Sequence, residues 1–165
     1  MLSDAHQHLL TQLGMLLGNA PIVADDHGSA GVALSDGSSI GIQIDVPADE
    51  LWLYADLGAV PDVPDVAEEL LRMQLFGRHT GGGAIAIGPG LAGELRLVLW
   101  RSLPITGFDA RMLSAMINRL GDAAAAWRES LDRLTTSESS DLARSVIPGG
   151  AEPAAIPSLP HGGFA

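Results

Sequence analysis

The sequence contains no cysteine and no lysine, and each absence narrows what the chain can do. Without cysteine there is no disulfide, no thiolate nucleophile and no thiolate metal site. The nine basic residues are all arginines and are outnumbered by 20 acidic residues, which gives a net charge of -11. Such a charge opposes binding to nucleic acid and to anionic lipid. We therefore expect no nucleic-acid partner, and a faster encounter with a basic one.

Long apolar runs and export signals are also missing. No apolar run reaches the ~20 residues that a membrane-spanning helix needs. The first 20 residues carry Asp4 but no positively charged residue, whereas a signal peptide begins with a positively charged region. These features predict a cytoplasmic protein that does not insert into a membrane.

No pattern indicates catalysis, a metal or a cofactor. The five histidines are scattered, and His6 and His8 would point in different directions on a helix. Residues 88–93 fit the pattern G-x-G-x-x-G, but a strand-like segment follows them, whereas a dinucleotide site needs a helix there. We expect no enzyme activity and no cofactor. A small-molecule pocket between sheet and helices stays compatible with the fold, without a residue pattern to support it.

Apolar periodicity and turn residues predict an α+β fold with about five antiparallel strands and three helices, in the order α-β-β-β-α-β-β-α. The expected helices span residues 4–17, 64–76 and 109–134, and the expected strands span residues 30–35, 40–46, 50–57, 84–87 and 94–103. Residues 1–134 would form the folded domain. Residues 135–165 are rich in Ser, Pro, Gly and Ala, which predicts a disordered tail.

The central helix carries more apolar residues than one face can hold, which predicts burial on a second side. Since a two-fold dimer is the commonest way to cover such a face, we expect a homodimer. The hairpin after the helix would join this interface. The expected dimer residues are Val66, Leu70, Leu71, Met73, Leu75, Ile85 and Ile87.

Two other apolar surfaces are candidates for binding a partner chain. The first helix has a leucine stripe that either packs into the core or forms the wall of a groove. Strand alternation places aromatic residues on the sheet face opposite the aliphatic one, where a loop or the tail covers them or where they form a protein-binding surface. The candidates are Leu9, Leu10, Leu13, Leu16, Leu17, Trp52, Tyr54, Val98 and Trp100.

Four sequence features together resemble one protein family. They are the segment LLRMQL at residues 70–75, Thr80 with two following glycines, the segment Leu103-Pro104-Ile105, and Ala126-Trp127 near the end of the last helix. In this order, and with the predicted elements, they resemble the class I type III secretion chaperones of the Tir chaperone family. The resemblance covers roughly residues 2–134. Ile105 departs from it, because the family has leucine at that place.

The resemblance implies a homodimeric cytoplasmic chaperone without nucleotide dependence. Such a protein binds the N-terminal segment of a secreted effector in extended form and keeps it soluble and competent for secretion. It also implies the secretion ATPase and sorting apparatus as a further partner. The leucine stripe, the aromatic face and any free strand edge would then receive the effector. The alternative is a regulatory or sensory module of the same fold, which binds a signalling protein that stays folded.

Overall fold

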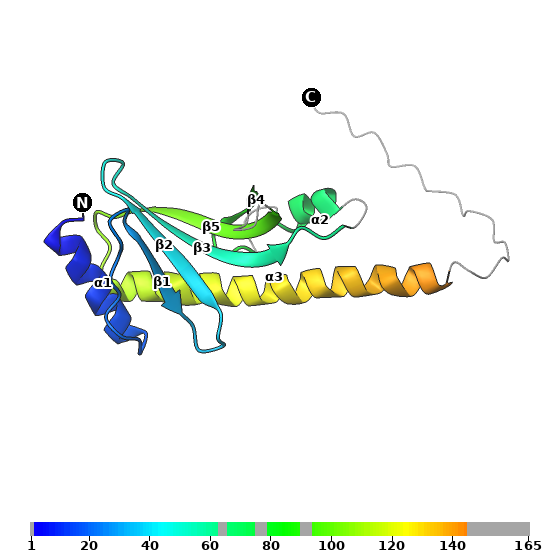
Figure 1. The fold of residues 1–165 in the computed structure, drawn as a ribbon, viewed down its shortest axis with the longest axis horizontal. Helices are drawn as coiled ribbons and strands as arrows, with labels where there is room; N and C mark the ends of the chain where they lie inside the picture. Colours follow the sequence, from blue (N-terminus) through cyan, green and yellow to red (C-terminus); the bar gives the residue numbers. More distant parts are fainter. Residues whose placement is uncertain (1, 63–65, 75–78, 90–93, 145–165) are drawn as a thin grey trace, which may run out of the picture.

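The computed structural model describes residues 2–62, 66–74, 79–89 and 94–144 (Figure 1). Its elements follow the predicted order and form an α+β fold with one five-stranded antiparallel sheet. They are α1 (Asp4–Leu16), β1 (Ser29–Ala33), β2 (Ser39–Asp45), β3 (Glu50–Ala59), α2 (Val66–Met73), β4 (Ala84–Pro89), β5 (Leu95–Pro104) and α3 (Ala110–Arg144).

The sheet has the strand order β1-β2-β3-β5-β4, α3 packs against its inner face, and α1 packs against α3 (Figure 1). The strands alternate as predicted, with Ile42, Leu53 and Leu99 fully buried beneath the helices. The intervening residues of β2 and β3 lie on the outer face and are exposed or half-buried. The fold is therefore two-layered, and the core lies between the sheet and the pair of helices.

The core-facing side of α3 is a continuous apolar stripe. Its buried members recur at alternating spacings of three and four residues, as expected for a helix face; they are Leu113, Ile117, Leu120, Ala124, Trp127 and Leu131. The Asp109 carboxylate caps the N-terminus of α3 by accepting a hydrogen bond from the Met112 N–H (2.8 Å). The helix ends at Arg144, so the predicted boundary at residue 134 falls inside it. Residues 145–165 of the predicted tail lie outside the described residues.

The glycine run at residues 81–83 forms a turn into β4, as predicted. Gly81 and Gly82 have φ of +62° and +87°, which favour glycine. A side chain on Gly83 would collide with the backbone carbonyl of Trp100. The turn is fixed from two sides, because Arg101 donates to the Gly81 carbonyl (2.9 Å) and the Thr80 hydroxyl donates to the Gly83 carbonyl (2.6 Å).

Two helix boundaries differ from the prediction besides that of α3. The helix α2 starts at Val66 and ends at Met73, whereas apolar periodicity extended it over residues 64–76, part of which lies outside the described residues. Helix α1 ends one residue early, at Leu16, and Asn19 caps its last turn by donating to the Gly14 carbonyl (2.9 Å). Within the described residues, no helix is long and apolar enough to span a membrane.

Candidate protein-binding surfaces

Three aromatic side chains form a patch on the outer face of the sheet, which we call the aromatic patch: Trp52, Tyr54 and Trp100. Tyr54 on β3 is directly opposite Trp100 on β5. The ring centroids of Trp52 and Trp100 are 6.2 Å apart. The three residues remain 43%, 40% and 37% exposed. The predicted outward direction of these side chains is therefore confirmed.

A glycine on β2 gives the aromatic patch its shape. Gly41 is opposite Tyr54, and a Cβ atom there would overlap the tyrosine ring. The ring thus lies directly over the β2 backbone. On the other side of the patch, Val98 is half-buried beside Trp100. The indole N–H of Trp52 donates to the Glu50 carboxylate (2.7 Å), which restricts its rotation.

Arg96 forms ion pairs with two carboxylates at the border of the patch. Arg96 lies 2.6 Å from the Asp56 carboxylate and 3.4 Å from that of Glu94. Partial burial opposes ionisation of Asp56, but hydrogen bonds from Arg96 and the Gly58 N–H, with the charges of Arg96 and Arg128, outweigh it. The pKa of Asp56 is therefore lowered from 3.8.

The leucine stripe of α1 divides between core and surface. Leu10 and Leu13 are fully buried in the core. The prediction that they belong to a binding surface is therefore wrong. Leu9 and Leu17 are half-buried and pack against that core. Leu16 is exposed. The stripe thus packs into the core through Leu10 and Leu13 and leaves Leu16 free to line a groove.

Sequence reasoning missed Met15, which lies beside Leu16 on α1. Met15 is exposed, and a groove of about 370 Å³ between α1 and the start of α3, which we call the methionine groove, is lined by Met15, Leu16 and Ala110. Met112 of α3 is also exposed. Its exposure follows from its position in the first turn of α3, where the adjacent Leu113 faces the core. Methionine at such a groove adapts to varied apolar partners.

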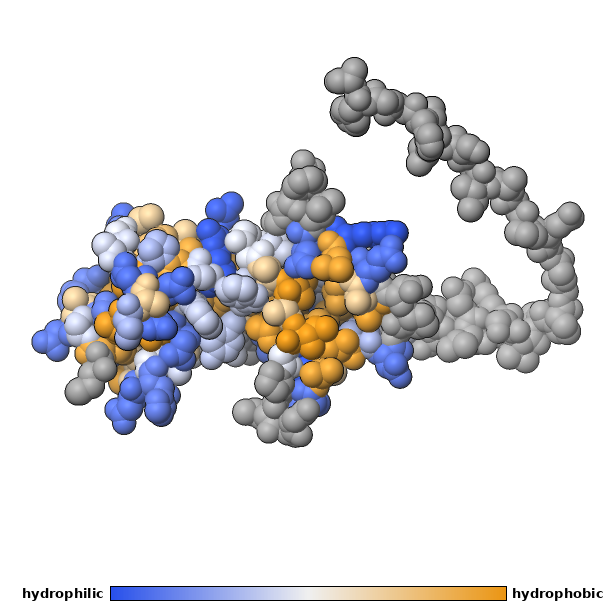
Figure 2. All heavy atoms as spheres, turned by 90° about the horizontal axis from the view of Figure 1, so that it is seen from above, coloured by the Kyte–Doolittle hydropathy of each residue, from blue (hydrophilic) through white to orange (hydrophobic). Residues whose placement is uncertain are grey.

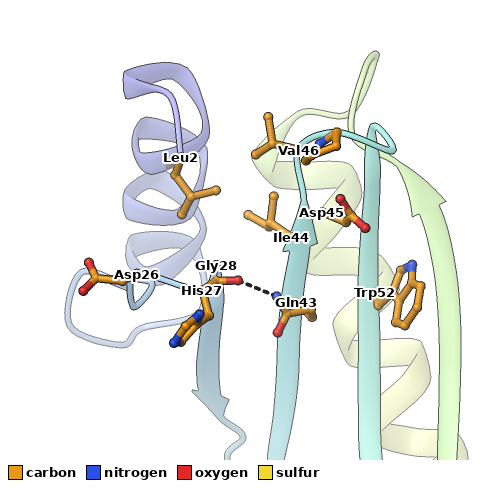
Figure 3. A pocket seen from close by; sticks show the side chains of 10 residues that line it. Leu2, Asp26, His27, Gly28, Gln43, Ile44, Asp45, Val46 and Trp52 are labelled. Carbon is orange, nitrogen blue, oxygen red and sulfur yellow. Dashed lines mark hydrogen bonds between the residues drawn. The ribbon is translucent and has the colours of Figure 1, made fainter.

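A second open groove, of about 320 Å³, lies between the start of α1 and the adjoining ends of β2 and β3 (Figure 3). Leu2 and Ile44 contribute apolar walls. Gln43 bridges the bottom by donating to the His27 carbonyl (2.7 Å) and accepting from the Ser29 hydroxyl (2.5 Å). Within the described part of the chain, no group of three histidine or acidic residues is placed to hold a metal ion.

The third surface is formed by α2 and β4. Leu71 and Ile87 are exposed, whereas Val66 and Ile85 are half-buried. Figure 2 shows apolar residues gathered over this half of the molecule. Gln74 joins the two elements by accepting a hydrogen bond from the Ile85 N–H (3.0 Å).

Three of the expected dimer residues need separate comment. Leu70 is only 5% exposed and belongs to the core of the single chain. The prediction that it lies in an interface between chains is therefore wrong. The helix presents Leu70 inward and Leu71 outward, as neighbouring residues on a helix point about 100° apart. The side chain of Met73, and Leu75 as a whole, lie outside the described residues.

The β1 edge of the sheet is partly occupied by local hydrogen bonds. At β1, Ser29 exchanges hydrogen bonds with Asp25, and the Asn19 side chain donates to the Ala33 carbonyl (2.9 Å). Gly31 lies between these two positions and shares the outward orientation of their backbone groups by alternation. The stretch of β1 open to a partner strand is therefore short.

A family model described as the Tir chaperone protein (CesT) family matches residues 8–128. Among curated protein sequences, none matches this chain significantly. Several solved structures share its fold.

The HopA1–SchA chaperone–effector complex gives a TM-score of 0.59 at 20% identity, covering 78% of this chain and 99% of the other. The ExsC–ExsE complex gives 0.61 at 15% identity, covering 78% and 94%. The Yersinia pestis type III secretion chaperone SycH, solved with a fragment of YscM2, gives 0.54 at 20% identity, covering 74% and 98%. Since the family model spans most of the chain, this protein belongs to the Tir chaperone (CesT) family.

Proposed function

We propose that this protein is a type III secretion chaperone that binds the N-terminal segment of a secreted effector in extended form. The observation that carries the proposal is an exposed aromatic patch on the sheet of a chain that belongs to this family. Two of the similar structures are complexes: the HopA1–SchA chaperone–effector complex and the ExoT–SpcS complex from Pseudomonas aeruginosa. Binding alone performs this function, so we propose no catalytic step.

The exposed surfaces suit an extended chain better than a folded one. The aromatic patch and the methionine groove lie on different faces of the molecule, and a globular partner would meet only one of them. An extended segment can place single apolar side chains on each in turn, as in other peptide-binding folds. Leu9, Leu16 and Leu17 would line the helical part of this path, and Trp52, Tyr54, Val98 and Trp100 the sheet part.

We also propose a homodimer formed through α2 and β4. The exposed Leu71 and Ile87, with the half-buried Val66 and Ile85, would be covered in a two-fold interface. The protein would act in the cytoplasm and deliver its cargo to the secretion ATPase and sorting apparatus.

The test is co-expression with candidate effectors from neighbouring genes, followed by affinity capture of the chaperone. We expect one effector to co-purify through its N-terminal segment, and that segment to become protease-resistant without gaining its own cooperative unfolding transition. The variant with Trp52 and Trp100 both changed to serine should capture less effector, whereas Val23→Ser, at an exposed site before β1, should capture as much as wild type. Effectors that stay soluble and are secreted normally without the chaperone would refute the proposal. A partner that binds only as a folded domain would favour the regulatory alternative.

A further inference from the structure

The aromatic patch lies between two groups of carboxylates. Asp45 and Glu50 are paired across β2 and β3 at one end of the outer sheet face. Asp56 and Glu94 lie at the other end, where both contact Arg96. Among the described residues of the five strands, Arg96 is the one cation on this face, because Arg101 points inward to the Gly81 carbonyl. With Arg128 of α3, whose charge also acts on Asp56, these four carboxylates still outnumber the guanidinium groups near them by two.

The rings themselves favour the same kind of ligand as the carboxylates. Trp52 and Trp100 are tilted by 51° to one another, and Tyr54 lies over Gly41 with its other side toward solvent. The face of an aromatic ring is electronegative and attracts a cation placed within about 6 Å. The aromatic rings at the centre of this face and the carboxylates at its two ends therefore both favour a positively charged group on an apolar chain.

Charge decides between the possible occupants. A second copy of this chain, placed face to face, would bring two negative faces together, which costs free energy. An uncharged apolar segment would leave the flanking carboxylates unused. A guanidinium group is planar, stacks on aromatic rings and pairs with carboxylates through two hydrogen bonds, whereas an ammonium group does not stack.

We propose that the aromatic patch binds an arginine side chain of an extended partner segment, stacked on Trp52 and Trp100 and paired with Glu50 or Asp45. The inference rests on the proposed function, because it assigns a side-chain class to the bound effector segment. Glu50 already accepts from the Trp52 indole (2.7 Å), and a carboxylate has acceptor sites for a second donor. Glu50 thus holds Trp52 in place and faces the guanidinium at the same time.

Two blocked heptapeptides test the proposal: SVLRLVS, and the same peptide with citrulline in place of arginine. Citrulline keeps the size and planarity of arginine and removes its charge. The full-length protein has three tryptophans, and Trp127 is buried, so its indole N–H signals in NMR spectra separate the patch from the core. We expect the arginine peptide to bind about fivefold more tightly and to shift the signals of Trp52 and Trp100 but not that of Trp127. The preference should shrink at about 1 M salt.

Variants give the test its controls. Trp100→Leu keeps an apolar surface and removes a ring, so the ratio of the two affinities should fall to about one. The double change Asp45→Asn and Glu50→Gln keeps hydrogen-bond acceptors and should weaken the arginine peptide alone. Val23→Ala, at an exposed site away from the patch, should change neither affinity. Unchanged melting temperatures would show that the variants fold.

Equal binding of the two peptides to wild type would overturn the proposal, as would the absence of shifts at Trp52 and Trp100. Either result would leave the chaperone function standing, because that function is measured by effector capture from cells. Conversely, failure of effector capture with a retained arginine preference would refute the chaperone function and keep the arginine site.

Discussion

The indole N–H of Trp127 donates a hydrogen bond to the backbone carbonyl of His79 across 48 residues of sequence, with a distance of 2.7 Å. Trp127 is the largest fully buried side chain described in the structure. The bond ties α3 to the glycine turn that leads into β4, so one residue of the last helix positions a strand of the proposed dimer surface.

Trp127→Phe should therefore destabilise the protein through both packing and hydrogen bonding. Loss of a partner for a part-buried carbonyl costs about 1–3 kcal/mol, and the smaller ring leaves a cavity that adds to this cost. Urea unfolding followed by circular dichroism would measure the change. Trp52→Phe is the matched control, because its indole bonds to Glu50 at the surface. A Trp127→Phe variant as stable as Trp52→Phe would show that the link to His79 contributes little.

Leu71→Asp should convert the proposed dimer to a folded monomer. Leu71 is 64% exposed in the single chain, so a carboxylate there is solvated in the monomer and buried only in the dimer. Multi-angle light scattering at several concentrations would give the mass. Val23→Asp adds the same charge at a site that is 72% exposed and away from α2, and should leave the mass unchanged. A variant that remains dimeric would place the interface on another surface.

Gly41→Ala should disturb the aromatic patch more than the fold. The new methyl group would overlap the Tyr54 ring, which can swing away because it is partly exposed. We expect a change of unfolding free energy below about 1 kcal/mol, since only a surface ring has to move, together with weaker effector capture. Gly31→Ala is the control, because open space lies beside Gly31 in the next strand. Equal capture by the two variants would mean that the position of Tyr54 is unimportant for binding.

The sequence was sufficient for the element order and for the two sheet faces, because strand alternation at Ile42, Leu53 and Leu99 depends on local periodicity alone. It was insufficient for deciding which apolar helix residues stay exposed. Leu13 and Leu16 belong to one leucine stripe, but only Leu13 lies under the sheet, and this depends on how α1 crosses α3.

The end of α3 shows another limit of the sequence. Residues 135–144 lack an apolar stripe in the sequence, so periodicity could not distinguish a helix from a disordered tail there. Thr135 and Thr136 donate to the Asp132 carbonyl (2.9 and 2.7 Å) within the same helix. Local hydrogen bonds of this kind carry no sequence period by which they could be recognised.

Asp56→Asn should lower stability at neutral pH and lose its effect in acid. The folded-state pKa of Asp56 lies below 3.8, so ionised Asp56 contributes stability fully above pH 3.8, and this contribution disappears as the pH falls through the folded-state pKa. Asparagine keeps an acceptor for the Gly58 N–H but has no charge for Arg96 and Arg128.

Because the Asp56 side chain is 54% exposed, we expect a loss of less than about 1 kcal/mol at pH 7. Urea unfolding of wild type and variant should give a constant difference between pH 5 and 7 that narrows below pH 3.8. Asp122→Asn removes an exposed charge from α3 and serves as the control for net charge. A difference between wild type and Asp56→Asn that persists unchanged into strong acid would show that the ion pair with Arg96 is not its source.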